Sequence, residues 1–210
     1  RRLVVTSTAK NEGKSTTAVA LAINFAQLGL KTVLIDADMR NPTIHKYLDL
    51  GNTNGLSNFL SGHSTAGTLP QVTEVPNLHV ITAGPIPSSP VHVLTGRKLG
   101  ELRDLLQADG VQFIILDGPP VLGLADAVVL GNQVPSVLYV AQASQTRKSH
   151  IKDAFRRLRM AGIVPRGVVL TKTTAQNTAY YTYDNYYGYG ADQAPGGDKG
   201  PKTEPMLRRA

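Results

Sequence analysis

The sequence of 210 residues contains no cysteine and no tryptophan. The absence of cysteine excludes disulfide bonds, thiolate zinc sites, iron–sulfur ligation and a cysteine nucleophile. No apolar run approaches the length of about 18 residues that a membrane-spanning helix needs, so none is expected in this chain. No signal peptide is visible at the start. The first residue is Arg1 rather than Met, which favours a piece of a longer protein.

The composition predicts a folded chain with an aliphatic core. Hydrophobic residues make up 41% and charged residues 18%, which excludes global disorder, and phenylalanine occurs only four times. The formal net charge is +7. A positive sum is compatible with nucleic acid or an anionic membrane as partner, but it selects neither. We expect no nucleic-acid partner.

Short β-rich runs alternate with helical stretches along the first part of the chain. This alternation predicts an α/β fold, a parallel β-sheet flanked by helices on both faces. Such sheets bind ligands outside the carboxyl ends of their strands. The apolar periodicity stops after about Thr173, and residues 190–210 have the composition of a flexible tail. The predicted strands cover 3–6, 32–35, 78–81, 113–116, 137–140 and 168–170, and the predicted helices cover 14–28, 90–106 and 149–160.

The strongest motif is the segment TAKNEGKST at 8–16, between the first strand and the first helix. It matches a phosphate-binding loop (P-loop) except that Thr8 replaces the first glycine. Backbone N–H groups of such a loop converge on a polyphosphate, while Lys14 reaches the β- and γ-phosphates and the Ser15 hydroxyl ligates Mg²⁺. A polar turn between strand and helix is the alternative. The predicted nucleotide-binding residues are Lys10, Asn11, Glu12, Gly13, Lys14, Ser15 and Thr16.

Three aspartates follow predicted strands. Asp36 and Asp38 come directly after the second strand, and at this spacing both side chains project to one side of an extended chain. One would accept a proton from an attacking hydroxyl or water, and the other would hold Mg²⁺ through water. Asp117 ends the apolar run at 113–116, as the second metal-binding element of P-loop enzymes does. Loop and strand-end positions without chemistry are the alternatives.

These three elements together resemble the deviant P-loop ATPases, a group that includes chromosome-partition and septum-positioning ATPases. Further segments resemble the bacterial tyrosine kinases within that group, over residues 3 to about 189. Three departures are visible. Lys10-Asn11 replaces the usual Pro-Gly, and His92 and Ser89 stand where Glu and Asn are usual. The chain also starts after the position of that family's Glu/Arg oligomerisation helix. The segments that carry the resemblance are 6–17, 36–42, 84–90, 116–122 and 125–127.

A cluster of tyrosines lies near the carboxyl end. Six of the eight tyrosines lie within ten residues. A low-complexity tail, an aromatic platform for nucleic acid and a hairpin on the sheet edge are alternative interpretations. The resemblance implies instead that these tyrosines are phosphorylated. They are Tyr180, Tyr181, Tyr183, Tyr186, Tyr187 and Tyr189.

The resemblance implies an ATP-dependent protein-tyrosine kinase that phosphorylates its own tyrosine tail or a neighbour's. It implies a P-loop kinase domain at 1–175 and a flexible tail at 176–210. It also implies control of exopolysaccharide or capsule synthesis and export, homo-oligomerisation, and a membrane-embedded activator or fused transmembrane region. The domain would be cytoplasmic, at the inner face of the cell membrane.

The resemblance also assigns roles to the candidate residues, with ATP and Mg²⁺ as cofactors. Lys14, Asp36 and Asp38 would be catalytic, with Asp36 activating the tyrosine hydroxyl. Ser15, Asp38 and Asp117 would organise Mg²⁺, directly or through water.

Two other functions are compatible with parts of the sequence. The first is a partition- or septum-type ATPase that acts as a nucleotide switch without phosphorylating protein. Those proteins carry a signature lysine at the position of Ala9, whereas Lys10 lies one residue further on. The second is an assembly protein with a degenerate kinase fold, which the intact Lys14 and the three aspartates disfavour.

A group of basic residues lies on or near the last predicted helix. Such residues most often form a solvated face, and contact with anionic lipid or a neighbouring subunit is the alternative. They are Arg147, Lys148, Lys152, Arg156, Arg157 and Arg159.

Overall fold

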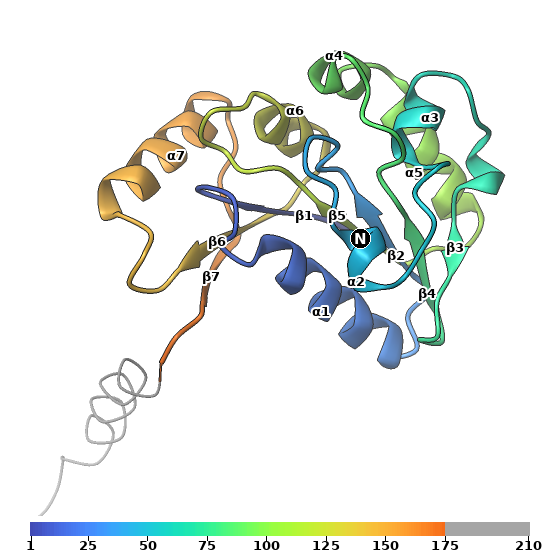
Figure 1. Cartoon of the computed structure of the whole chain (residues 1–210), viewed down its shortest axis with the longest axis horizontal. Coiled ribbons are helices and arrows are strands. Elements are labelled where there is room, and N and C mark those ends of the chain that lie inside the picture. The colour runs from blue at the N-terminus through green and yellow to red at the C-terminus, as the bar shows by residue number, and fades with distance from the viewer. Residues whose placement is uncertain (175–210) are drawn as a thin grey trace, which may run out of the picture. The chain divides into compact units, whose positions relative to one another are not determined.

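The computed structural model describes residues 1–174, which form a seven-stranded sheet in the order β3-β4-β2-β5-β1-β6-β7 (Figure 1). All neighbouring strands pair in parallel except β3 and β4, which are antiparallel. The predicted tyrosine sites and the predicted boundary between 175 and 176 lie outside the described residues. The strands are β1 (Arg2–Ser7), β2 (Thr32–Asp36), β3 (Gln71–Val72), β4 (Leu78–Ile81), β5 (Phe113–Asp117), β6 (Val137–Gln142) and β7 (Gly167–Thr171).

Helices cover both faces of this sheet (Figure 1). The helices α1 and α2 pack on one face, and α3 to α7 pack on the other. Within residues 1–174, no helix has the length and apolar character needed to cross a membrane. The helices are α1 (Lys14–Gln27), α2 (Ile44–Tyr47), α3 (Leu56–Leu60), α4 (Pro90–Leu94), α5 (Lys98–Ala108), α6 (Asp126–Gln133) and α7 (Lys148–Met160), with a short 3₁₀ turn η1 (Ala66–Thr68).

The central strand β5 explains why the sheet has two cores. Ile114 and Leu116 pack in the larger core under α3 to α7, whereas Ile115 packs on the α1 side. Alternate residues of a strand face opposite sides of the sheet, so a continuous apolar run is needed when both sides are covered. The predicted parallel sheet with helices on both faces is therefore confirmed, together with all six predicted strands.

The prediction that 90–106 is mostly helical is confirmed, and the structure divides this segment into two helices, α4 and α5. Leu94 and Leu99 are both buried in the same core. Five residues apart, they would point about 140° away from each other on one continuous helix. A break at 95–97 lets both side chains face the sheet. The sequence prediction also missed the two-residue strand β3 and the helices α2, α3 and α6.

The topology brings the candidate site together at one edge of the sheet. The strand β5 lies between β1 and β2, and Asp36 is the register partner of Asp117. The loop that follows β1 leads directly into α1. The carboxyl ends of these three neighbouring strands therefore place the P-loop beside both aspartates.

Candidate active site

The P-loop uses two residues with left-handed backbone conformations. Gly13 precedes the first residue of α1 with φ 90°, and a Cβ atom there would lie 3.2 Å from the side chain of Thr171. Asn11 has φ 67°. Among residues other than glycine, asparagine tolerates this conformation best. Asn11 can therefore adopt the left-handed backbone conformation at this position, where the bacterial tyrosine kinases that the sequence resembles usually have glycine.

Thr8, which replaces the first glycine of the motif, has a buried partner. Its hydroxyl shares a hydrogen bond of 2.7 Å with the hydroxyl of Tyr139 on β6. The Tyr139 ring in turn packs edge-on against Phe155 of α7. The threonine thus joins the start of the loop to the neighbouring strand.

The side chain of Glu12 stabilises the P-loop through two hydrogen bonds within the protein. One carboxylate oxygen accepts a hydrogen bond from the backbone N–H of Ala9 at 3.0 Å, and the other accepts one from the Thr146 hydroxyl at 2.6 Å. The carboxylate is therefore engaged within the protein. The predicted contact of Glu12 with nucleotide would come from its backbone N–H.

The end of β7 is also attached to the P-loop. The Thr171 hydroxyl donates to the carbonyl oxygen of Glu12 at 2.6 Å. The ammonium of Lys172 donates to the carbonyl oxygen of Asn11 at 2.8 Å and to the side chain of Gln142 at 3.0 Å. The sequence analysis did not identify Thr146, Thr171 or Lys172, because only the arrangement of the strands brings them to the loop.

This attachment gives the first prediction. Thr171→Val removes one hydroxyl without changing the shape of the side chain, and it should lower the free energy of unfolding by about 1 kcal/mol. ATP binding should weaken as well, because the loop backbone loses a support. Thermal unfolding and nucleotide titration measure the two effects, with Thr173→Val, at an exposed position, as the control. Unchanged values for both would show that the bond does not support the loop.

Lys14 lies among three buried carboxylates. Its Nζ atom is 2.9 Å from an Asp38 oxygen and 3.6 Å from an Asp117 oxygen, and it donates to the Ser15 hydroxyl at 3.2 Å. Burial alone would lower the pKa of Lys14, but the charges of Asp117 and Asp38 outweigh it, so the pKa is raised. The ammonium stays charged and holds the P-loop helix against the ends of β2 and β5.

Asp36 fixes the turn that follows β2. One of its oxygens accepts hydrogen bonds from the backbone N–H groups of Thr43 and Ile44, both at 3.0 Å, and the other accepts one from Asp38 at 3.3 Å. Burial raises the pKa of Asp36 to about 7, and the negative charge of Asp117 contributes in the same direction. The sequence analysis did not predict this structural role.

The carboxylate of Asp117 is suited to binding a cation. It has no exposed surface, and within residues 1–174 neither oxygen has a hydrogen-bond partner, although the Lys14 ammonium lies 3.6 Å from one of them. Burial raises its pKa to about 6, against the opposing effect of Lys14. Buried polar atoms without partners are rare and costly in proteins. These oxygens therefore fit a cation that binds at this edge of the sheet.

The predicted Mg²⁺ residues fit a shared site with a phosphate ligand. Asp38 and Asp117 both contact Lys14, and the Ser15 hydroxyl lies beside the same ammonium group. No group of three or more acidic or histidine side chains within residues 1–174 converges on a point. Mg²⁺ in phosphoryl-transfer sites needs only one or two carboxylates together with substrate phosphates. The donor set is thus compatible with Mg²⁺ bound to a nucleotide.

A second ion pair positions the loop after β2. The Arg40 guanidinium binds the buried Asp126 carboxylate, with Nε 2.6 Å from an oxygen. Asp126 opens α6. Both residues belong to the segments that carry the family resemblance, and their contact joins those segments without touching Lys14.

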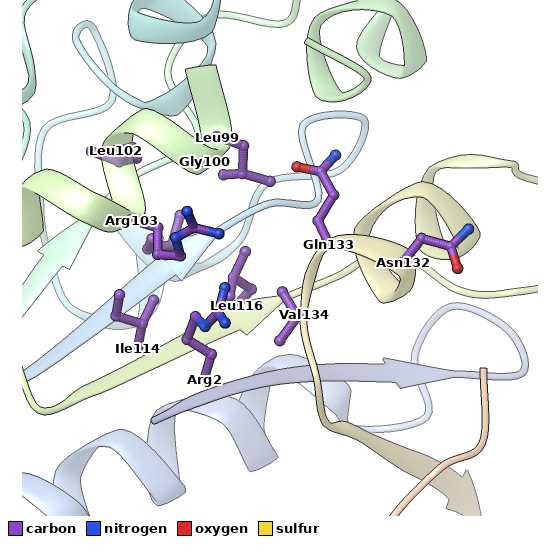
Figure 2. Close-up of a pocket in the computed structure, with 11 residues that line it drawn as sticks. Arg2, Leu99, Gly100, Leu102, Arg103, Ile114, Leu116, Asn132, Gln133 and Val134 are labelled. Carbon is purple, nitrogen blue, oxygen red and sulfur yellow. The ribbon is translucent and has the colours of Figure 1, made fainter. Parts of the chain in front are cut away.

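A cavity of about 280 Å³ lies away from this site, between α5, α6 and the sheet (Figure 2). Its walls include Arg2, Arg103 and Leu116. None of the P-loop residues and none of the three aspartates line it. The cavity is therefore separate from the candidate nucleotide site.

Comparison with known proteins agrees with this geometry. Residues 3–189 match the CobQ/CobB/MinD/ParA nucleotide binding domain family. The chain is 36% identical over 191 residues to the tyrosine-protein kinase YwqD of Bacillus subtilis, which covers 89% of this chain and 80% of YwqD.

Solved structures show the same fold. The chimerical protein CapA2B2 superposes with a TM-score of 0.77 at 38% identity, over 81% of this chain and 75% of that one. The septum site-determining protein MinD of Pyrococcus horikoshii, complexed with Mg-ADP, superposes with a TM-score of 0.67 at 21% identity, over 81% of this chain and 69% of that one. The second likeness concerns the fold alone. From the matched domain and the identity with YwqD, the chain belongs to the CobQ/CobB/MinD/ParA nucleotide-binding family and, within it, to the bacterial tyrosine-protein kinases.

Proposed function

We propose that this chain transfers the γ-phosphoryl group of ATP to tyrosines of its own cluster at 180–189 or of a neighbouring copy. The observation that carries the proposal is that the P-loop lysine lies between two buried carboxylates, and that one of them, Asp117, accepts no hydrogen bond from the described part of the chain. Phosphoryl transfer needs positioning and charge neutralisation above all, and these groups supply both.

Each residue of the site has a proposed task. Lys14 and the backbone N–H groups of the loop bind the β- and γ-phosphates. Asp36 accepts the proton of the tyrosine hydroxyl, whose oxygen bonds to the γ-phosphorus as the bond to the β-phosphate oxygen breaks and ADP leaves. Ser15, Asp38 and Asp117 hold Mg²⁺, directly or through water. The ion, when bound, neutralises charge on the phosphates.

The proposal includes a place for the protein in the cell. The related kinases imply control of exopolysaccharide or capsule synthesis and export, through tyrosine phosphorylation. They also imply a homo-oligomer at the inner face of the cell membrane, with a membrane-embedded activator or a fused transmembrane region as partner. These parts rest on the family relationship and on no contact within residues 1–174.

The three aspartates should differ when each is changed to asparagine. Asp38→Asn and Asp117→Asn should weaken Mg²⁺-dependent nucleotide binding, because each removes a negative charge from the metal site. Asp36→Asn should bind Mg-ATP nearly normally and transfer slowly. An asparagine oxygen can still accept the hydrogen bonds from Thr43 and Ile44, and only the longer one from the backbone N–H of Asp38 is lost, so the turn should survive.

Isothermal titration and single-turnover labelling measure these two steps separately. Asp49→Asn is a matched control, because Asp49 is exposed and has φ 50°, which asparagine tolerates. Equal loss of nucleotide binding in all three variants would refute the division of roles. In that case all three aspartates would share one role, which is to hold the metal.

The function itself is tested by the intact mass of the whole chain after incubation with Mg-ATP. We expect stepwise addition of phosphoryl groups, up to one for each of the six clustered tyrosines, and none with ADP. Nucleotide binding or hydrolysis without added mass would instead support a nucleotide switch of the partition or septum type. Absence of nucleotide binding would support an assembly protein.

A further inference from the structure

The outer side of α7 carries a concentration of positive charge that the proposed chemistry does not use. The helix contains five cations and a single carboxylate, Asp153. Its inner side packs on the sheet through Ala154 and Leu158, which are fully buried. The five cations of α7 are exposed, whereas the core fixes the orientation of the helix through its buried residues.

Four of these cations lie along one flank of α7. Lys148, Lys152, Arg156 and Arg159 are spaced by four, four and three residues, and all are exposed. Residues at these spacings follow one another on the same side of a helix. We call this set the α7 cationic stripe. Within residues 1–174, only Arg156 of the stripe has an ion-pair partner, Asp153 at 2.9 Å.

Apolar side chains extend the stripe at its carboxyl end. Met160 follows Arg156 by four residues, one turn further along the same side, and its surface is 82% exposed. Val164, in the turn that follows α7, is 73% exposed. A row of cations beside exposed apolar side chains is the pattern of a helix that lies on a lipid surface, with the cations at the headgroups.

We propose that the α7 cationic stripe, with Met160 and Val164, docks on an anionic lipid surface. Anionic headgroups complement the cations, and the apolar side chains gain an apolar phase that a nucleic acid does not offer. Each cation near such a surface contributes about fivefold to the affinity. The proposal does not rest on the proposed kinase activity, because lipid binding requires neither ATP nor the residues of the active site.

The test uses the whole chain and vesicles of phosphatidylglycerol and phosphatidylcholine in equal parts. Co-sedimentation should detect binding that weakens with salt and is absent with phosphatidylcholine alone. The variant Lys148→Gln/Lys152→Gln/Arg159→Gln should bind about 100-fold more weakly. Its control, Arg1→Gln/Lys46→Gln/Arg97→Gln, removes the same charge from three exposed positions elsewhere and should bind like the unchanged chain.

A second variant separates lipid insertion from simple charge attraction. Met160→Gln/Val164→Gln keeps every charge and should still weaken vesicle binding, by a factor that persists at high salt. Equal losses in the triple variant and in its control would overturn the proposal, since net charge rather than the stripe would then be responsible. Binding of duplex DNA that depends on the stripe, without vesicle binding, would overturn it in favour of nucleic acid.

Discussion

Lys14→Met is expected to abolish phosphorylation of the tyrosine cluster, with a loss of at least about 10³-fold in the rate of transfer. The ammonium of Lys14 is the cation that contacts Asp38 and Asp117, and methionine keeps most of the volume of the side chain without its charge. Single-turnover labelling with γ-labelled ATP measures the effect. Lys46→Met, an exposed lysine on α2, is the control and should transfer at the normal rate.

The same substitution should also cost stability. Asp38 and Asp117 are buried beside Lys14, and without the ammonium their charges face each other with no cation between them. Removing one partner of a buried ion pair costs about 3 kcal/mol or more. That is a large part of a typical domain's stability but less than the whole. We therefore expect a folded protein with a lower melting temperature.

Measuring both quantities keeps the two effects apart. Labelling is compared at a temperature at which circular dichroism shows the variant to be folded. Transfer at the normal rate by folded Lys14→Met protein would remove the site assignment. A melting temperature equal to that of the unchanged chain would instead show that the ion pairs of Lys14 make no net contribution to stability.

The P-loop and the aspartates of this site can be predicted from the sequence, because each is a local pattern and a parallel sheet places all of them at one edge. A phosphate-loop motif between strand and helix, and aspartates at strand ends, need only a parallel sheet to be brought to one edge. The break between α4 and α5 cannot be predicted in this way, because it depends on which leucines are buried against the sheet. The spacing of Leu94 and Leu99 contains this information only once both are known to be buried.

The hydrogen bonds that hold the P-loop to β7 and to the segment after β6 depend on long-range packing and could not be predicted. Glu12 contacts Thr146 and Thr171, which lie 134 and 159 residues further along the chain. Their meeting requires β6 and β7 to lie beyond β1 in the sheet. In the sequence, Glu12 is a position of the loop to which the motif assigns no residue type, and its place in the motif predicts only a nucleotide contact. Asp36 is a similar case, because its backbone partners belong to a turn without a sequence signature.

The second large effect concerns the tyrosine cluster as substrate. Changing all six clustered tyrosines to phenylalanine should abolish labelling of the protein by γ-labelled ATP while nucleotide binding remains. Tyr47→Phe is the control, since Tyr47 is exposed but lies outside the cluster. Undiminished labelling of the sixfold variant would show that the phosphorylated residues lie elsewhere.

The last described strand, β7, ends beside the P-loop. Thr171 and Lys172 both donate hydrogen bonds to the backbone of the P-loop. In general, a flexible chain of about 16 residues spans roughly 20–24 Å root-mean-square. A segment of this length would allow the tyrosines to approach the nucleotide site of the same chain or of a neighbouring copy. Transfer between copies is the expected route, because a neighbour's tail need not fold back sharply next to its own anchored end.

Mixing two variants tests this route. One is Lys14→Met with its tail, and the other is an active chain that ends after Thr173. We expect label on the tail of the Lys14→Met chain, at a rate that rises with total concentration. Labelling of the unchanged chain at a rate independent of dilution, with none in the mixture, would show transfer within one chain or within a stable assembly.

Phosphorylation of the cluster should then act on assembly through charge. Each phosphotyrosine adds about −1.5 to −2 charges, and six add roughly −9 to −12. The formal charge of the chain is +7, so complete phosphorylation makes it net negative. Copies that share this charge repel one another, and we expect an assembled form to dissociate as labelling proceeds. Light scattering during the reaction measures this, with the sixfold phenylalanine variant as the control that should stay assembled. Dissociation of both at the same rate would assign the change to nucleotide turnover.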